Sequence, residues 1–406
     1  MSEIVLGTLL LTALLILLTL AVLAARSVLT PMKPAKLTVN DDTAFDVHTN
    51  EKLLAALHEN DVLVPSACAG AGTCGLCRVR VVEGGMDAQP TELARLSKAD
   101  LREGMHLACQ VIIRNDMKVE VPEGLLGAET FMCTVATTRF LTPLIREIVL
   151  QMPRDRRPDI VAGSFVQLTA RPFALSFSSL DVPDRYADAW GHLRPLHVAT
   201  DEPVTRAYSI SDRPEDIEAG RIVLNIRLAL PSPDVAGAPP GVVSSWLFSL
   251  KQGDQVETSG PFGSVRVQDT DREMVFIGGG VGMAPLRAMI HEQLQRVGSD
   301  RKMTFWYGAR SRAELFYADE FDALAEKHPN FDWTVVLSAP APGDDWQGET
   351  GFVHAVAWEK HLKEHPAPEE CEYYLCGPPL MIQAVLAMLE DAGVERDRIF
   401  NDDFGV

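Results

Sequence analysis

The stretch MVFIGGGVGMAPLRAMIHEQL, Met274–Leu294, joins an apolar run, a glycine-rich turn and a helical pattern. The apolar run predicts a buried strand, and Pro285 stands near the start of the helix, where proline is favoured. Backbone N–H groups in such a turn face anions, which makes it a candidate site for a dinucleotide pyrophosphate. It is not the usual dinucleotide fingerprint, because it comes late in the chain and lacks the spaced acidic residue. The candidate residues of this turn are Gly278, Gly279, Gly280, Gly282 and Pro285.

The same alternation continues to the C-terminus. MTFWYGAR and WTVVLSA predict strands, DEFDALAEKH predicts a helix, and EYYLCGPPLMIQAVLAMLEDAG predicts a further strand, turn and helix. Strands that alternate with helices predict an α/β domain with a parallel, doubly wound sheet. The turn with Cys376, Gly377 and Pro378 follows one of these strands, so we expect it at the same edge of the sheet as the glycine turn. The alternative is a tight turn with a buried cysteine.

Residues 129–268 have a different pattern, in which short strand-like runs are separated by turns. This pattern is typical of a small antiparallel β-barrel. Within it, RAYSIS (Arg206–Ser211) lies in a predicted strand, and GVVSSW (Gly241–Trp246) predicts a glycine turn that opens a helix. Taken alone, an Arg-x-Tyr-Ser strand is usually no more than a strand.

Four cysteines have the spacing Cys68-x5-Cys74-x2-Cys77-x31-Cys109, three on one loop and the fourth on a distant predicted strand. Four thiolates suit zinc or an iron–sulfur cluster. Zinc sites usually contain two C-x2-C pairs, whereas the fourth cysteine here is alone. A 2Fe-2S cluster with four thiolates is negatively charged, and the small residues of CAGAGTCGLC leave backbone N–H groups accessible to its sulfurs. We therefore predict a 2Fe-2S cluster, with zinc and structural thiols as alternatives.

The residues around this loop predict a grasp-type α+β domain. KLTVN, FDVHT, CRVRVVEGG and HLACQVIIRNDMKVEVPE predict strands, and EKLLAALHEN and TELARLSKADLREG predict helices. The chain of 406 residues is thus expected to be multidomain. The predicted parts are a transmembrane anchor at 1–26, a 2Fe-2S ferredoxin domain at 36–128, a flavin barrel at 129–268 and a nucleotide domain at 269–406.

The segment Ile4–Ala25 carries no charge over 22 residues, which is long enough for a helix to cross the hydrocarbon core of a bilayer. A cleaved signal peptide is the alternative, but no basic residue precedes the run and it exceeds the usual apolar region of such peptides. Arg26 and Lys33 follow the span and Glu3 precedes it. The positive-inside rule then predicts a single-pass protein with its N-terminus outside and its main body cytoplasmic. A net charge of −19 without a basic patch excludes nucleic acid as a partner.

The cysteine loop resembles those of plant-type and adrenodoxin-type ferredoxins, and its first gap of five residues matches the second group. RAYSIS and GVVSSW, followed by the glycine turn, resemble the ferredoxin-NADP reductase superfamily. That resemblance implies that Arg206 pairs with a phosphate of FAD, that Tyr208 stacks on the isoalloxazine and that Ser209 bonds near flavin N5. It also implies that Gly241 and Ser244 face the pyrophosphate. The longer second motif favours FAD, with FMN as the alternative.

The same resemblance places Cys376 near the nicotinamide C4, where the hydride leaves. It also implies a C-terminal aromatic residue over the flavin, which in DDFGV is Phe404. The candidate catalytic residues are therefore Ser209, Cys376 and Phe404. NADH is the expected substrate by resemblance, although Arg310 and Arg312 could serve the 2′-phosphate of NADPH.

The order of the three modules occurs in reductase components of bacterial oxygenases. The apolar N-terminal segment, the long insertion before Arg206 and the motifs GPFG, FIGGGVGMAPLR, WYGARS and DDFG resemble the F subunits of sodium-translocating NADH:quinone oxidoreductases. That resemblance covers the whole chain. It implies a bacterial inner-membrane protein that passes electrons from NADH through FAD and a 2Fe-2S cluster to membrane subunits, which reduce ubiquinone and move sodium. The alternatives are an anchored reductase that serves an oxygenase and a membrane-tethered redox sensor without turnover.

Overall fold

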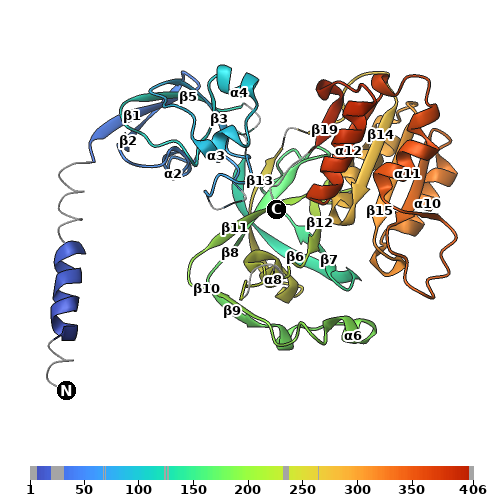
Figure 1. Cartoon of the computed structure of the whole chain (residues 1–406), viewed down its shortest axis with the longest axis horizontal. Coiled ribbons are helices and arrows are strands. Elements are labelled where there is room, and N and C mark those ends of the chain that lie inside the picture. Colours follow the sequence, from blue (N-terminus) through green and yellow to red (C-terminus); the bar gives the residue numbers. More distant parts are fainter. Residues whose placement is uncertain are drawn as a thin grey trace. The chain divides into compact units, whose positions relative to one another are not determined.

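The computed structural model describes residues 7–19, 32–66, 68, 70–122, 125, 128–231, 237–263 and 265–401. They form two compact units, which Figure 1 labels by element. One unit comprises Met1–Val64 and Gly70–Leu126, and the other comprises Pro65–Ala69 and Gly127–Val406. Phe404 and the rest of 402–406 lie outside the described residues.

Residues 7–19 form an exposed helix, within the span predicted to cross the membrane. Residues 4–6 and 20–25 of that span lie outside the described residues. Among the residues that are described, no helix has both the length and the apolar character needed to cross a membrane. The transmembrane helix therefore stays a prediction.

The first unit is a five-stranded sheet in the order β2-β1-β5-β3-β4. β1 pairs with β5 in parallel, and the other neighbours are antiparallel. Apolar residues that alternate along β1 pack with one face of helix α2 around Leu37, Leu53 and Leu57, all fully buried. This arrangement confirms the predicted α+β domain. Its strands are β1 (Pro34–Val39), β2 (Thr43–His48), β3 (Arg78–Glu83), β4 (Met105–Leu107) and β5 (Met117–Glu120), and its helices are α2 (Leu53–Glu59), α3 (Pro90–Leu93) and α4 (Lys98–Arg102).

Two local predictions in this unit were wrong. The helix expected over TELARLSKADLREG is divided into α3 and α4, because the Ser97 hydroxyl accepts the N–H of Asp100 and starts a new helix. The strand expected around Cys109 ends at Leu107, and Gln110 N–H bonds back to the Leu107 carbonyl in a turn. The fourth cysteine therefore lies on a turn between two strands.

The second unit begins with a six-stranded antiparallel sheet in the order β11-β8-β13-β6-β7-β12. Its edge strands meet through a bridge between Ile210 and Leu224, so the sheet curls into the predicted barrel around a shared core. Helix α8 packs against β8, β11 and β12. The strands are β6 (Glu129–Thr142), β7 (Ile145–Gln151), β8 (Phe165–Ala170), β11 (Val204–Ser209), β12 (Arg221–Arg227) and β13 (Gln255–Phe262), and the helices are α7 (Pro214–Glu218) and α8 (Val242–Ser249).

The insertion before Arg206 folds onto this barrel. It consists of the hairpin β9 (Phe173–Ser176) and β10 (His197–Thr200) with short helical turns at Phe177–Ser179, Asp184–Tyr186 and α6 (Ala187–Trp190). Phe177 and Trp190 are fully buried in the barrel core, and the Trp190 indole donates to the carbonyl of Pro143 at 2.8 Å. The insertion is therefore part of the barrel's hydrophobic core.

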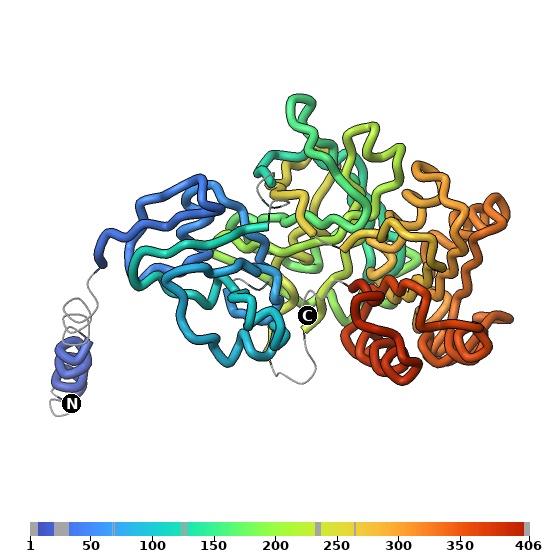
Figure 2. The backbone as a smooth tube through the Cα atoms, turned by 90° about the horizontal axis from the view of Figure 1, so that it is seen from above, coloured from blue at the N-terminus to red at the C-terminus, as the bar shows by residue number. Residues whose placement is uncertain are grey.

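The C-terminal part is a six-stranded sheet in the order β17-β16-β15-β14-β18-β19, and all its neighbours are parallel. Phe276 of β14 enters a core with α9 and α10, whereas Val275 enters a second core with α11 and α12. Both faces are thus covered, as predicted, and α11 lies beside α12 (Figure 2). The strands are β14 (Met274–Gly279), β15 (Met303–Ala309), β16 (Phe331–Leu337), β17 (Glu349–Thr350), β18 (Glu372–Cys376) and β19 (Ile399–Asn401). The helices are α9 (Met283–His291), a π-helical turn at Glu292–Val297, α10 (Ala318–Lys327), α11 (Val353–Lys360) and α12 (Pro379–Asp391), with 3-10 turns at Gly280–Gly282, Arg312–Glu314, Leu362–Glu364, Pro368–Glu370 and Arg396–Arg398.

Replacing Trp190 by Ala tests the place of the insertion in the barrel core. We expect a loss of about 3 to 5 kcal/mol, because the change removes a fully buried indole and leaves a cavity. Thermal and urea unfolding, followed by flavin release, should show earlier loss of the barrel. His192→Ala is the control, since His192 lies in the same insertion but is exposed. Equal stability of the two variants would mean that the insertion does not support the barrel.

Candidate functional site

Three of the four cysteines in the predicted cluster set are buried in the first unit. Cys74, Cys77 and Cys109 are 4%, 1% and 0% exposed, and none of them forms a disulfide. Cys68 is partly exposed, and both of its neighbours in the chain lie outside the described residues. The first unit therefore brings these three thiols together.

Hydrogen-bond donors surround the sulfur of Cys109. The Cys77 thiol donates to it, which lowers the pKa of Cys109 despite burial, and the Gln110 side chain and the Gly72 N–H act in the same direction. The Gln110 amide lies 3.2 Å from this sulfur. Gly72 has a φ of +77°, and a Cβ there would stand 2.9 Å from the Gln110 carboxamide. Such donors are what a negatively charged cluster requires at its sulfurs, so these residues fit a 2Fe-2S centre.

The predicted flavin residues lie on β11 of the barrel. All six residues of this strand are half-buried, so Arg206, Tyr208 and Ser209 retain accessible surface. The Arg206 guanidinium donates to the adjacent Thr205 carbonyl at 2.8 Å. Tyr208 packs against the edge of the barrel core. A strand with no fully buried residue can present both charged and aromatic groups to a bound molecule.

The glycine turn of GVVSSW lies beside this strand, because Gly241 precedes α8 and α8 packs on β11. The Ser244 hydroxyl donates to the Gly241 carbonyl at 3.1 Å and accepts the Ala229 N–H at 3.2 Å. Ser245 also donates to the Gly241 carbonyl, at 2.7 Å. The two hydroxyls thus fix the shape of the turn. A contact of Ser244 with a pyrophosphate stays a prediction.

The two nucleotide turns meet at the carboxyl edge of the parallel sheet. Gly278 of β14 is paired with Cys376 of β18. A Cβ on Gly282 would stand 2.0 Å from the Cys376 carbonyl oxygen, so only glycine fits there. Gly377 also lies close to Gly279, with 3.1 Å between the Cβ position of Gly377 and the Gly279 nitrogen. The structure therefore joins the two turns that the sequence predicted separately.

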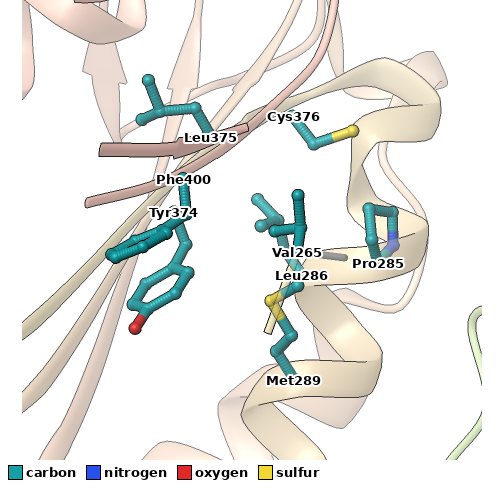
Figure 3. A pocket seen from close by; sticks show the side chains of 8 residues that line it. All are labelled: Val265, Pro285, Leu286, Met289, Tyr374, Leu375, Cys376 and Phe400. Carbon is teal, nitrogen blue, oxygen red and sulfur yellow. The ribbon is translucent and has the colours of Figure 1, made fainter. Parts of the chain in front are cut away.

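Cys376 is 8% exposed and borders a small apolar cavity between α9 and the strands β18 and β19 (Figure 3). The cavity has a volume of about 10 Å³, which is room for no more than one water molecule, so it is too small for a nicotinamide. The cavity adjoins the two turns, and the side chains that line it are largely apolar. Its lining includes Pro285, Leu286, Met289, Leu375, Cys376 and Phe400.

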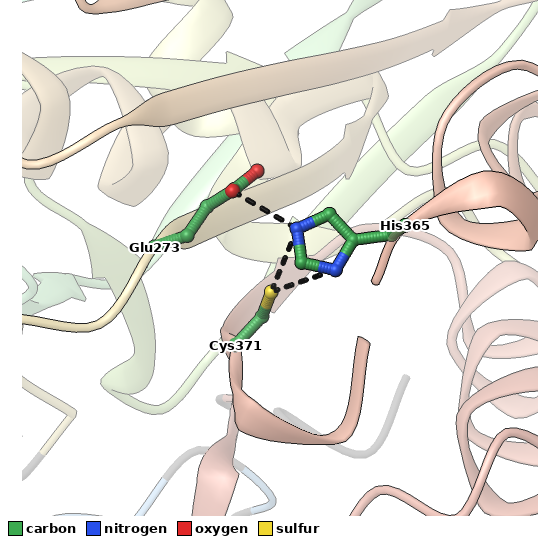
Figure 4. Close-up of side chains that lie close together, drawn as sticks. All are labelled: Glu273, His365 and Cys371. Atoms are coloured by element: carbon green, nitrogen blue, oxygen red, sulfur yellow. Dashed lines mark hydrogen bonds and ion pairs between the residues drawn. The ribbon is translucent and has the colours of Figure 1, made fainter. Parts of the chain in front are cut away.

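A polar cluster lies at the opposite, amino end of this sheet, where Glu273 precedes β14 and Cys371 precedes β18 (Figure 4). The Glu273 carboxylate accepts from His361 at 3.0 Å, His365 at 3.1 Å and Lys302 at 3.2 Å. Burial raises the pKa of Glu273, but these three donors outweigh it and lower the pKa to about 2.

The Ala367 N–H donates to His365 Nδ1 at 3.2 Å, which leaves the proton of a neutral imidazole on Nε2, the nitrogen that faces Glu273. That nitrogen then has no lone pair for a metal. The cluster is therefore a carboxylate that accepts hydrogen bonds from three side chains, and it lies far from the nucleotide turns.

The sequence did not predict a chain of contacts between the barrel and the nucleotide domain. Arg287 of α9 is 3% exposed, and its guanidinium donates to the Ser211 carbonyl and to both oxygens of Glu320 in α10. The sequence feature that could have indicated these contacts is an arginine inside the apolar run MAPLRAMI.

Two exposed apolar residues at the carboxyl edge were also missed by the sequence analysis. They are Phe352 before α11 and Leu380 in α12, which are 70% and 80% exposed.

Comparison with known families divides the chain in the same way. Residues 37–114 match the 2Fe-2S iron-sulfur cluster binding domain, residues 190–267 the oxidoreductase FAD-binding domain and residues 276–387 the oxidoreductase NAD-binding domain. The F subunit of the Na(+)-translocating NADH-quinone reductase of Neisseria meningitidis serogroup C is 47% identical over 405 residues, which covers 99% of this chain and 100% of the relative. The corresponding protein of Idiomarina loihiensis is 45% identical over 409 residues, with both chains fully covered.

The chain belongs to the family of F subunits of Na(+)-translocating NADH-quinone reductases. The predicted membership in this family and the predicted 2Fe-2S, FAD and NAD modules are thereby confirmed.

Two solved structures share the fold at low sequence identity. The cytochrome P450 reductase of Amycolatopsis has a TM-score of 0.64 at 24% identity and covers 91% of this chain and 98% of its own. The ferredoxin reductase in carbazole 1,9a-dioxygenase has a TM-score of 0.59 at 24% identity, with 92% and 99% covered. The chain therefore shares its three-module fold with reductases of other systems.

Replacing Cys74 by Ala tests the cluster set. We expect loss of the 2Fe-2S signal in electron paramagnetic resonance with FAD retained, because the cysteine loop and the barrel have separate cores. Cys133→Ala is the matched control, since Cys133 is equally buried but lies in the barrel core. An unchanged signal in the Cys74 variant would remove this residue from the ligand set, and zinc in place of iron in the wild type would exclude the cluster.

Replacing Arg206 by Ala tests the flavin strand. A charge-assisted bond to phosphate contributes about 1.5 to 3 kcal/mol, so FAD affinity should fall roughly ten- to a hundredfold. Fluorescence titration of the deflavinated protein with FAD measures the change. Arg171→Ala is the control, because Arg171 lies at the end of the neighbouring strand and pairs with Glu257 on the surface. Equal affinity of both variants for FAD would exclude Arg206 as a phosphate ligand.

Proposed function

We propose that this chain is the electron-input component of its complex, which oxidises NADH and passes the electrons toward membrane subunits that reduce ubiquinone and move sodium. The observation that carries this proposal is the close packing of Gly282 against Cys376. It brings the two turns together, which supports a single dinucleotide site with Cys376 beside the nicotinamide. Bound FAD accepts a hydride and gives up electrons singly, and a 2Fe-2S centre takes one electron at a time.

The residues of the barrel bind and orient the flavin in this proposal. Arg206 holds a phosphate, Tyr208 stacks on the isoalloxazine, and Ser209 hydrogen-bonds near N5. Gly241 and Ser244 lie at the pyrophosphate, where the start of α8 offers backbone N–H groups. The half-buried state of all of β11 supports these roles, because a bound flavin would cover surface that the protein leaves accessible.

The nucleotide domain binds NADH at its carboxyl edge in this proposal. The turn Gly278–Gly282 and the helix that contains Pro285 offer N–H groups to the pyrophosphate, and Cys376, Gly377 and Pro378 border the nicotinamide. Cys376 excludes water from the reacting carbon, and Phe404 covers the flavin in the absence of nucleotide. The exposed side chains of Phe352 and Leu380 at this edge are available to the adenine ring.

The surroundings of Arg312 favour NADH over NADPH. Its backbone N–H donates to the Asp344 carboxylate at 3.2 Å, and its guanidinium donates to the Asp344 carbonyl at 3.1 Å. A 2′-phosphate near Arg312 would lie beside this carboxylate, and like charges repel. NADH has an uncharged ribose hydroxyl at this position, so no such repulsion arises.

The proposed domain boundaries are 1–26, 36–128, 129–268 and 269–406. The first of these is a single transmembrane helix over Ile4–Ala25 that holds the protein in the bacterial inner membrane, with the N-terminus outside and the catalytic body in the cytoplasm. The basic residues Arg26 and Lys33 after the apolar run support this orientation. The lipid bilayer and the other subunits of the complex are the expected partners, and ubiquinone is reached through those subunits.

A protein that starts at Lys33 tests this division between anchor and catalytic body. We expect it to be soluble, to contain FAD and iron, and to oxidise NADH with ferricyanide at the full-length rate, because every candidate redox residue follows Lys36. It should not reduce ubiquinone at a useful rate with the remaining subunits in vesicles, because loss of the helix lowers its effective concentration beside them. The full-length chain in the same vesicles is the control. Loss of NADH oxidation in a folded, cofactor-replete protein would contradict the assignment of the chemistry to the cytoplasmic body.

A further inference from the structure

Arg287 joins the nucleotide helix to the flavin barrel. Its Nη1 donates to the carbonyl of Ser211, two residues beyond the flavin residue Ser209. The backbone N–H of Ser211 bonds in turn to the Val223 carbonyl on β12, which fixes this segment to the barrel. Arg287 itself lies in α9, the helix that follows the turn at Gly282. One side chain therefore contacts the segments that carry the two proposed binding sites.

The same guanidinium is held in a single orientation. Its Nε and Nη2 donate to the two carboxylate oxygens of Glu320 at 2.6 and 2.9 Å, and His291 bonds to the first of these oxygens at 2.6 Å. A planar guanidinium that makes two parallel bonds has its direction fixed as well as its position. The remaining nitrogen of the planar guanidinium, Nη1, donates to the Ser211 carbonyl. Lysine carries its three N–H donors on one nitrogen, so it lacks the planar fork that fits both Glu320 oxygens while a separate N–H reaches Ser211.

Tyr317 forms a second link between the same two domains. Its ring lies 4.4 Å from the Arg287 guanidinium, and its hydroxyl donates to Glu147 at 2.5 Å and accepts from Asn225 at 2.8 Å. Glu147 and Asn225 belong to the barrel strands β7 and β12. Tyr317 has a φ of +61°, a conformation that is unfavourable for a bulky side chain. Its backbone strain persists because the ring and hydroxyl are fixed on both sides.

A buried ion pair is seldom more stabilising than apolar residues of the same size, so stability alone does not account for a charged group with 3% exposure at this junction. Polar contacts also fix the orientation of one domain relative to the other, which apolar packing does not do. Hydride transfer requires donor and acceptor atoms about 3 to 3.5 Å apart, and an error of about 1 Å lowers the rate roughly a hundredfold.

We propose that Arg287 is a positioning residue for hydride transfer: through Ser211, Glu320 and the ring of Tyr317, it sets the orientation of the nucleotide domain on the flavin barrel and so the distance between nicotinamide and isoalloxazine. This proposal rests on the proposed function, since it requires that NADH and FAD bind at the two turns and at β11. It assigns Arg287 no contact with either cofactor.

The test compares Arg287→Lys with Arg301→Lys in the full-length, cofactor-replete protein. Arg301 is also a largely buried guanidinium, with 10% of its side chain exposed, and it pairs with Glu372 at 2.6 Å, but both of these residues belong to the nucleotide domain. Rapid mixing with saturating NADH gives the rate of flavin reduction, the long-wavelength absorbance gives the stacking of nicotinamide on flavin, and titration gives the NADH affinity. We expect Arg287→Lys to reduce flavin roughly 10- to 100-fold more slowly, with weaker long-wavelength absorbance, NADH affinity within about threefold of wild type and unchanged FAD and iron content. Arg301→Lys should retain the wild-type rate and absorbance.

Tyr317→Phe provides a second, milder variant that keeps the ring beside Arg287 but loses the bonds to Glu147 and Asn225. It should show the same signature, with flavin reduction slowed about tenfold. If Arg287→Lys does not fold, this variant decides the question alone. Wild-type rates in Tyr317→Phe and in any folded Arg287→Lys protein, or equal slowing in Arg301→Lys, would overturn the proposal. If the proposed function itself were wrong, the result would be different, because NADH would not reduce even the wild-type protein.

Discussion

The carboxyl ends of two neighbouring parallel strands, β14 and β18, approach so closely that no side chain fits between Gly282 and the Cys376 carbonyl. This contact decides where the nucleotide turns lie, because β14 and β18 are paired along their length and end at the same edge. It also explains the glycine content of both turns, since Gly278 packs against Leu286 and Gly377 against Gly279. The proposed chemistry of Cys376 depends on this spacing, because a wider gap would admit water to the reacting carbon.

The barrel keeps one strand, β11, partly accessible at the edge of a dense core. The insertion that ends before Arg206 supplies large apolar residues to that core, with Trp190 and Phe177 fully buried. β11, at the edge of the same barrel, has no fully buried residue. The insertion thus adds packing to the core, and β11 keeps surface that a cofactor can cover.

The sequence predicted those features that depend on local pattern. The glycine turn, the alternation of strands and helices and the cysteine loop are each set by neighbouring residues, and the three modules followed from them. Predictions failed where a single side chain changed the local path, as at Ser97, which starts a new helix. The contacts between domains could not be predicted, because Arg287 and Ser211 are separated by 76 residues, and Tyr317 and Glu147 by 170. An arginine within an apolar helix signals that a partner exists, but the sequence does not identify it.

The cysteine loop and the proposed hydride site depend on separate hydrophobic cores. Cys77 and Cys109 belong to the core of the first unit, around Leu53 and Val79, whereas the proposed flavin and nucleotide residues lie on elements that pack around the cores of the second. Hydride transfer needs two molecules held at a fixed short distance, and a side chain such as Arg287 holds the two halves of the second unit in one orientation. Transfer of single electrons does not require bond formation between donor and acceptor, so its geometry is less strict than that of a hydride. The chain accordingly places its directional, buried polar contacts at the junction where the hydride moves, and it gives the one-electron centre a core of its own.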